Sequence, residues 1–354
     1  MLGCKSLGQL LTLVASVVAL LGVCAASYRH PVADYFDRFI YEAIVLEKSR
    51  PIEAVYGIVK HENQRSEASS ILDSPQHLHE LEPLYAIRPL YVEALRALSF
   101  VMPLRQGIDF LSAASYFGIG IIAILWTRRP VLAVMLMSAY PLLVLARIGA
   151  PDSLSALFVI TGLWLIEQRR IQSVGLLLLL VSITVRTDNI LLLLATIAWC
   201  AWGKRVGYAA GAAFALLSAA FVCAINYWAG NYGWIALFHY SFLGHGSLSP
   251  AEMPHTLTLE QYVGALLRGT LAIAVHVTLW ILLGILSWFR RPSSVLIIVL
   301  SAVTAHFLMF PSPEDRYFIW AYIVTGIALI RSFDPPGLDM PSGQVSVAMT
   351  KRLS

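Results

Sequence analysis

Apolar runs alternate with short polar turns along most of this chain. A run of about 17 to 25 apolar residues is long enough to cross a bilayer as a helix, and a helix satisfies its own backbone hydrogen bonds inside lipid. The pattern predicts an all-α, polytopic membrane protein with about ten transmembrane helices. The predicted spans are residues 7–27, 107–126, 130–146, 152–166, 171–185, 189–202, 206–228, 265–288, 293–310 and 317–330.

The composition agrees with this pattern. Hydrophobic residues make up 58% of the chain and charged residues only 13%, which is typical of an integral membrane protein. The net charge of +4 comes from basic pairs that are separated along the sequence rather than gathered in one patch. We therefore expect membrane lipid, and no nucleic acid, as a partner.

The basic pairs also predict the topology, because short turns rich in Lys and Arg stay in the cytoplasm. Both termini are then cytoplasmic, and two long loops, residues 28–106 and 229–264, lie outside. Residues 1–333 form one integral membrane domain, and the tail of residues 334–354, rich in Pro, Gly and Ser, is expected to be disordered. The pairs are Arg128 and Arg129, Arg169 and Arg170, Lys204 and Arg205, and Arg290 and Arg291.

Three short outer turns, residues 146–153, 185–189 and 311–318, each hold an arginine and at least one carboxylate. The neighbouring apolar runs are short, so we expect these turns to lie below the outer membrane surface, in a cavity between helices. Charge at that depth is costly and often marks a substrate pathway. The alternative is that the charges only pair with one another and cap helix ends.

The first outer loop contains two predicted amphipathic helices next to the membrane. In the first, the apolar residues repeat at helical spacing and predict a helix on the outer membrane face, with Asp34, Asp37 and Tyr41 on its polar side. In the second, Pro89 can begin a helix and holds Arg88 just before it. Arg88 is then placed either to bind a lipid phosphate through two hydrogen bonds or to serve as an interfacial anchor.

These loop residues resemble motifs of the GT-C superfamily, the polytopic glycosyltransferases that use sugars carried on polyprenyl phosphate. Asp37 with Tyr41 four residues later is similar to the DxxxY element that carries the catalytic aspartate in the aminoarabinose transferases of that superfamily. Tyr85, Arg88 and Pro89 resemble its later element of tyrosine, basic residue and proline, with arginine in place of lysine.

The three outer turns also resemble elements of bacterial members, through Pro151 with Asp152, Arg186 with Asp188, and Arg316 with Tyr317. Two features depart from the superfamily pattern. Arg38, and not a second acid, follows Asp37, and no soluble outer domain follows the last predicted span. The first departure leaves open whether Asp34 or Asp37 is the base, and the second points to a simple acceptor.

The resemblance implies an inverting glycosyltransferase that moves a sugar from polyprenyl phosphate to a hydroxyl of a glycan, lipid or protein. Asp37, or alternatively Asp34, would be the general base. The expected phosphate-binding residues are drawn from Arg88, Arg147, Arg186 and Arg316. The other expected substrate contacts are Tyr41, Tyr85, Asp152, Asp188, Glu314, Asp315, Tyr317 and His239.

Two other classes of function fit the same pattern: a flippase or transporter of lipid-linked sugar, and a noncatalytic subunit of a polysaccharide assembly complex. The clustering of charge at one end of the helices, without a visible repeat, favours the enzyme over a transporter. We expect a multi-pass protein of a bacterial inner membrane with its active site facing the periplasm. A lumenal site in the endoplasmic reticulum satisfies the same topology rules.

Histidines give little sign of a metal site. His239, His245 and His255 are dispersed in the second outer loop, which could close over a substrate as a lid, and the spacing of His77 and His79 is no more typical of ligands. We therefore predict no metal ligands and no cofactor, and leave a divalent cation as an option to be tested with a chelator.

Overall fold

The computed structural model describes residues 6–31, 36–62, 74–167, 171–244, 249–272, 275–290 and 293–333. Within these ranges the regular structure is helical throughout, with seventeen α-helices and three short 3₁₀ helices, so the all-α prediction is confirmed. Asp34 and the predicted tail, residues 334–354, lie outside the described residues.

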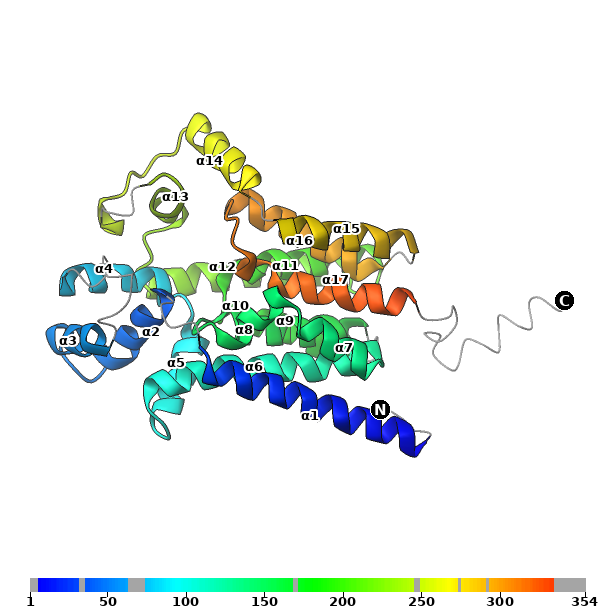
Figure 1. The fold of residues 1–354 in the computed structure, drawn as a ribbon. Helices are drawn as coiled ribbons and strands as arrows, with labels where there is room; N and C mark the ends of the chain where they lie inside the picture. Colours follow the sequence, from blue (N-terminus) through cyan, green and yellow to red (C-terminus); the bar gives the residue numbers. More distant parts are fainter. Residues whose placement is uncertain are drawn as a thin grey trace.

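Most of the helices form one bundle, in which the first residues of α1 and the last residues of α17 lie at the same end (Figure 1). Its core is a single apolar cluster to which all of these helices contribute. The bundle consists of α1 (Leu7–Arg29), α6 (Leu104–Thr127), α7 (Pro130–Met137), α8 (Tyr140–Arg147), α9 (Asp152–Glu167), α10 (Gln172–Ile183), α11 (Ile190–Trp202), α12 (Tyr208–Trp228), α15 (Val275–Arg290), α16 (Ser294–Met309) and α17 (Ile319–Ser332).

Three of these helices, α1, α6 and α12, are long and apolar enough to cross a membrane, and α7 with α8 would make a fourth if the bent pair is one span. Membrane association is therefore indicated, but by length and composition the described residues support far fewer spans than the ten predicted. Five further apolar helices are shorter: Gln172–Ile183, Thr187–Trp202, Trp280–Arg290, Ser294–Met309 and Ile319–Ser332.

The described residues show fewer spans than predicted because most of the other apolar helices have only 10–17 residues, and because breaks interrupt some of the predicted runs. The run 130–146 is bent by 74° between α7 and α8, where Pro141 lies in the first turn of α8 and cannot donate a hydrogen bond to the preceding turn. The run 265–288 is also divided, since α14 ends at Leu271 and α15 begins at Val275.

The predicted outer loops are largely helical as well, and they lie at the opposite end of the bundle from the start of α1 (Figure 1). A second apolar cluster joins the helices of the first loop to one another and to Ile108 and Val185 of the bundle end. These outer elements are α2 (Phe36–Glu47), α3 (Ile52–Glu62), α4 (Pro75–Tyr85), α5 (Pro89–Ser99), α13 (Trp234–Phe242), η4 (Pro250–Glu252) and α14 (Leu259–Leu271).

Helix α2 confirms the predicted helix, and the side that carries Asp37 and Tyr41 is buried as well. Phe39 and Ile40 of the apolar stripe are fully buried, and so is Tyr41, while Asp37 is only 4% exposed. The helix is thus enclosed on both sides, because α4 and α5 pack against it along with α3. A carboxylate in that position must be held by hydrogen bonds or opposite charge.

Helices α9 and α10 pack with almost no space between their backbones. A Cβ atom added at Gly175 would lie 2.6 Å from the carbonyl oxygen of Gly162 and 2.6 Å from Cγ1 of Ile166. Only glycine permits this approach, which is a common way for membrane helices to associate.

Replacing Gly175 with alanine tests this packing. Intrinsic helix propensity alone favours alanine by about 1 kcal/mol, but the added methyl group collides with backbone that cannot move aside. We expect Gly175→Ala to lower the Tm measured in detergent. Gly22→Ala is the matched control, since a Cβ there meets nothing within 4 Å, and it should leave the Tm unchanged or raise it. Equal Tm values for the two variants would contradict the close packing.

Candidate functional site

Asp37 is the centre of a polar cluster buried between the first outer loop and the bundle. It lies in the first turn of α2. Its Oδ2 accepts a hydrogen bond from Nη1 of Arg316 at 2.6 Å, and its Oδ1 accepts one from the hydroxyl of Tyr85 at 3.2 Å. Residues from three parts of the sequence therefore converge on one carboxylate.

These contacts keep Asp37 ionised. Burial by itself would raise the pKa of Asp37, but the positive charges of Arg316 and Arg88, together with the hydrogen bonds from Arg316 and Tyr85, outweigh it and hold the pKa below its ordinary value. Burial, reinforced by the negative charge of Asp37, raises the pKa of Tyr85 well above its usual range. Tyr85 therefore remains a proton donor to the carboxylate.

Arg88 lies beside this pair because of the turn between α4 and α5. Pro89 begins α5 with Arg88 at the position just before it, as the sequence predicted. The amide of Leu90 donates to the carbonyl oxygen of Thr184 at 3.1 Å, which ties the start of α5 to the end of α10.

The guanidinium of Arg88 is surrounded by aromatic groups. It donates to the hydroxyl of Tyr41, and its central carbon lies 5.8 Å from the ring centre of Tyr41 and 5.2 Å from that of Tyr85. Among the described residues, no carboxylate forms an ion pair with Arg88. The one hydrogen bond described for its N–H groups is the one to the Tyr41 hydroxyl, so within the described residues its charge is not held by a carboxylate.

Arg186 follows α10 and joins two of the predicted outer turns. It pairs with Asp152, the first residue of α9, and it holds both oxygens of Asp188, through Nη2 to Oδ2 at 2.7 Å and Nε to Oδ1 at 3.1 Å. Asp188 lies in the 3₁₀ helix η3 (Thr187–Asn189). Asn189 fixes this turn by donating to the hydroxyl of Ser155 at 2.8 Å.

The third turn brings in Arg316 through the 3₁₀ helix η5 (Asp315–Tyr317). Besides Asp37, Arg316 contacts Glu314, whose Oε2 lies 2.6 Å from Nε. The ring of Tyr317 lies between two guanidinium groups, with its centre 4.8 Å from the central carbon of Arg316 and 4.9 Å from that of Arg186. Tyr317 thus connects the Asp37 pair to the Arg186 pair.

Two members of the cluster were missed by sequence reasoning. His306 was not among the predicted site residues, yet its Nδ1 lies 3.2 Å from Oδ2 of Asp188. Tyr91 packs edge-on against Tyr41 at 4.8 Å between ring centres, and its buried hydroxyl has no hydrogen-bond partner within the described ranges. A polar residue within an apolar run was the one available signal for His306, and Tyr91 had none.

Three of the predicted residues have their described contacts elsewhere. Arg147 donates from Nε to the carbonyl oxygen of His30 at 2.7 Å, at the end of α1. The Nε2 of His239 lies 2.9 Å from the carbonyl oxygen of Thr256, within the second outer loop. Asp315 accepts from the hydroxyl of Tyr322 at 2.8 Å and so anchors η5 to α17.

Arg38, which follows Asp37, points into a different polar group. It is 1% exposed and pairs with Asp109 of α6 and, at 3.8 Å, with Glu42 one turn along α2. The two neighbouring residues therefore hold α2 through different partners, Asp37 through Arg316 and Arg38 through Asp109. Among the described carboxylates, Asp37 is the candidate base that contacts Tyr85 and Arg316.

The arrangement provides an ionised, buried carboxylate next to the guanidinium groups of Arg316 and Arg88, and Tyr317 links it to a third guanidinium group, that of Arg186. A carboxylate in this state can accept a proton, and an arginine fork can bind the oxygens of a phosphate in parallel. In the structure, Arg316 is paired with Asp37 and Glu314, and Arg186 is paired with Asp152 and Asp188. An anion entering the cluster would compete with those carboxylates for Arg316 and Arg186, but would meet Arg88 directly.

Comparison of the chain with protein-family models, with curated proteins and with solved structures finds no match.

The pair formed by Asp37 and Arg316 should be strongly coupled in stability. Removing one partner of a buried ion pair leaves the other uncompensated at a cost of about 3 to 5 kcal/mol, so Arg316→Gln should lower the Tm markedly. Adding Asp37→Asn to that variant should restore part of the loss. Glu314→Gln removes the half-exposed partner of Arg316 and should cost under about 1 kcal/mol. Additive effects in the double variant would contradict the coupling.

The same ion pair predicts that the stability of the folded protein depends on pH. Because the pKa of Asp37 is depressed in the folded protein, its stabilising contribution is present above the ordinary carboxyl pKa and is lost as the pH falls through the folded value. In Arg316→Gln burial is no longer outweighed by that charge, so Asp37 is easier to protonate. The Tm difference between parent and Arg316→Gln should therefore be largest near neutral pH and shrink in acid.

Proposed function

We propose that this protein is an integral membrane glycosyltransferase that transfers a sugar, with inversion, from polyprenyl phosphate to a hydroxyl acceptor. The observation that carries the proposal is the burial of ionised Asp37 beside Arg316 and Tyr85, with Arg88 next to it and free of any carboxylate partner among the described residues. The sequence resemblance to the GT-C superfamily, through Asp37 and Tyr41 and through Tyr85 and Arg88, is a second and independent support.

In the proposed reaction, the carboxylate of Asp37 takes the proton of the acceptor hydroxyl as that oxygen forms a bond to the anomeric carbon. The bond between this carbon and the phosphate oxygen breaks on the opposite face of the sugar, and its electron pair leaves with polyprenyl phosphate. Attack opposite the leaving group inverts the anomeric configuration. Arg88 and Arg316 stabilise the charge that develops on the departing phosphate.

The donor itself would activate the base. With Arg316 bound to it, Asp37 is a weak base, since its pKa is depressed. A donor phosphate that takes over Arg316 withdraws this charge from Asp37, and burial then raises the carboxylate's proton affinity. Proton transfer is thereby linked to the presence of the donor.

The membrane arrangement is part of the proposal. The five shorter apolar helices, together with α9 and the bent pair of α7 and α8, would complete the set of ten predicted spans in a locally thinned bilayer. Helix α16, with 16 residues, is about 24 Å long at 1.5 Å per residue, against roughly 30 Å of hydrocarbon. The polar cluster would then lie near the outer surface, which for a bacterial inner membrane is the periplasmic side. Lipid donor would enter sideways, and the glycan, lipid or protein acceptor from outside.

Replacement of the proposed base tests the reaction. In purified protein in nanodiscs, supplied with a panel of polyprenyl-phosphate sugars, the parent should release polyprenyl phosphate. Asp37→Asn should lower turnover by about 10² to 10⁴, the usual contribution of a general base. Normal turnover in Asp37→Asn would remove Asp37 as the base.

The control for this experiment is Glu93→Gln, which changes an exposed carboxylate on α5 that pairs with Arg96. Its turnover should equal that of the parent. Saturable lipid binding by the parent with no release from any donor would instead favour a noncatalytic subunit or a flippase, and would contradict the proposed enzyme.

Arg88 provides a separate test of phosphate binding. Removing one preorganised charge contact typically costs about 10² to 10³ in rate, so Arg88→Gln should lower turnover by that factor and weaken donor binding. Arg88→Lys should recover only part of the loss, because lysine keeps the charge but lacks the planar fork.

Arg96→Gln is the matched control, since Arg96 lies on the same helix and pairs with exposed Glu93. Turnover and donor affinity should match those of the parent. Equal donor affinity in Arg88→Gln and in Arg96→Gln would show that Arg88 does not bind the donor.

A further inference from the structure

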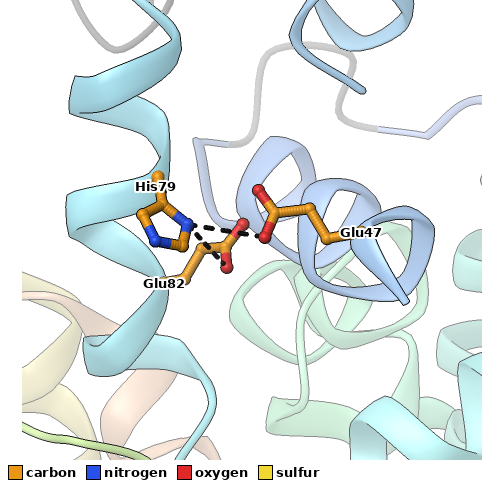
Figure 2. Close-up of side chains that lie close together, drawn as sticks. All are labelled: Glu47, His79 and Glu82. Carbon is orange, nitrogen blue, oxygen red and sulfur yellow. Dashed lines mark ion pairs between the residues drawn. The ribbon is translucent and has the colours of Figure 1, made fainter. Parts of the chain in front are cut away.

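A second group of polar side chains lies away from the Asp37 cluster, where the end of α2 meets α4. Glu47, His79 and Glu82 point toward one another there (Figure 2), with one potential ligand atom from each lying within 4.8 Å of the others. The residues are far from adjacent in sequence, and the spacing of histidines alone gave no sign of the group.

The local sequence holds the three side chains in place. Ser74 caps α4 by accepting from the amide of His77, and Pro75 begins the helix. The buried residues Leu78 and Leu81 fix the rotation of α4 against α2, and His79 and Glu82, three positions apart, then face α2 together.

The distances between these ligand atoms fit a bound ion better than direct hydrogen bonds. Nδ1 of His79 lies 3.4 Å from Oε2 of Glu47 and 3.6 Å from Oε2 of Glu82, longer than the usual range of about 2.7 to 3.2 Å for a nitrogen–oxygen hydrogen bond. A tetrahedral ion with bonds of about 2.1 Å keeps its ligands roughly 3.4 Å apart.

One oxygen of each carboxylate, Oε1 of Glu47 and Oε1 of Glu82, lacks a hydrogen-bond partner among the described residues. The two side chains are only 18% and 13% exposed. Two adjacent buried carboxylates repel each other unless a cation or a proton lies between them.

A proton is the competing occupant. Burial, together with the hydrogen bond and charge of Glu47, raises the pKa of Glu82. A metal ion that binds here must displace this proton, as is general for metal sites built from protonatable ligands.

We propose that Glu47, His79 and Glu82 form a divalent metal site that takes Zn²⁺ in preference to Mg²⁺. One imidazole nitrogen and two carboxylate oxygens suit zinc, whereas magnesium prefers an octahedral set of oxygens. His79 is 63% exposed, so the ion can enter from the aqueous side, and water completes the coordination.

The ion would act as a clamp and not as a catalyst. Glu47 is the last residue of α2 and Asp37 lies ten residues before it, which is about 15 Å along the helix. Glu82 precedes Tyr85 by three residues on α4. Joining α2 to α4 at this point would fix the hydrogen bond between Tyr85 and Asp37. The evidence for metal binding does not rest on the proposed transferase reaction.

Metal titration tests the proposal without reference to activity. Full-length protein, stripped with a chelator and placed in nanodiscs, is titrated with ZnCl₂ and separately with MgCl₂ by calorimetry, and its Tm is measured with and without Zn²⁺. The parent should bind one equivalent of Zn²⁺, and the bound Zn²⁺ should raise its Tm. Glu47→Gln, His79→Ala and Glu82→Gln should each weaken Zn²⁺ binding at least tenfold and abolish the gain.

His61→Ala is the matched control, because His61 is an exposed histidine on the neighbouring helix α3, and it should behave as the parent. X-ray absorption of the zinc-loaded parent, which needs no variant, should show one imidazole and otherwise oxygen ligands. Absence of saturable Zn²⁺ binding, equal binding in all variants, sulfur ligands or several imidazoles would each overturn the proposal and leave a proton-sharing carboxyl pair.

Discussion

The fold of the outer end depends on compensating the buried charge of Asp37. Its partner Arg316 lies 279 residues further along the chain, so the first outer loop and the last part of the bundle must meet before this ion pair can form. An isolated ion of either sign at this depth is costly. The pairing therefore specifies how the helices of the loop sit on the bundle, and Tyr317 extends the same constraint to Arg186 and its two carboxylates.

The features that could be predicted from sequence are those with a local cause. Apolar composition predicts helices, Pro89 predicts the start of α5 with Arg88 before it, and the three turns that hold arginine and carboxylate do come together. The described helices support fewer spans than the ten predicted. Apolar composition does not reveal where a run ends or bends, as it does by 74° between α7 and α8.

Contacts between distant residues could not be derived in this way. The helical spacing of Asp37 and Tyr41 places both residues on the polar side of α2. It does not reveal that α4 and α5 cover that side. The group of Glu47, His79 and Glu82 was overlooked for the same reason, since one ligand comes from α2 and two from α4. Helical periodicity gives the face on which a side chain lies, but not the element that packs against that face.

The glycine contact between α9 and α10 determines how the arginines of the polar cluster are held. Asp152 begins α9 and Arg186 follows α10, so both are mounted on a helical hairpin whose halves are too tightly packed to slide or part. Arg316, by contrast, is carried on a separate turn after two prolines, Pro311 and Pro313. The close glycine contact therefore fixes the position of Arg186, whereas Arg316 is positioned by its ion pairs with Asp37 and Glu314 and by the hydrogen bond that joins Asp315 to α17.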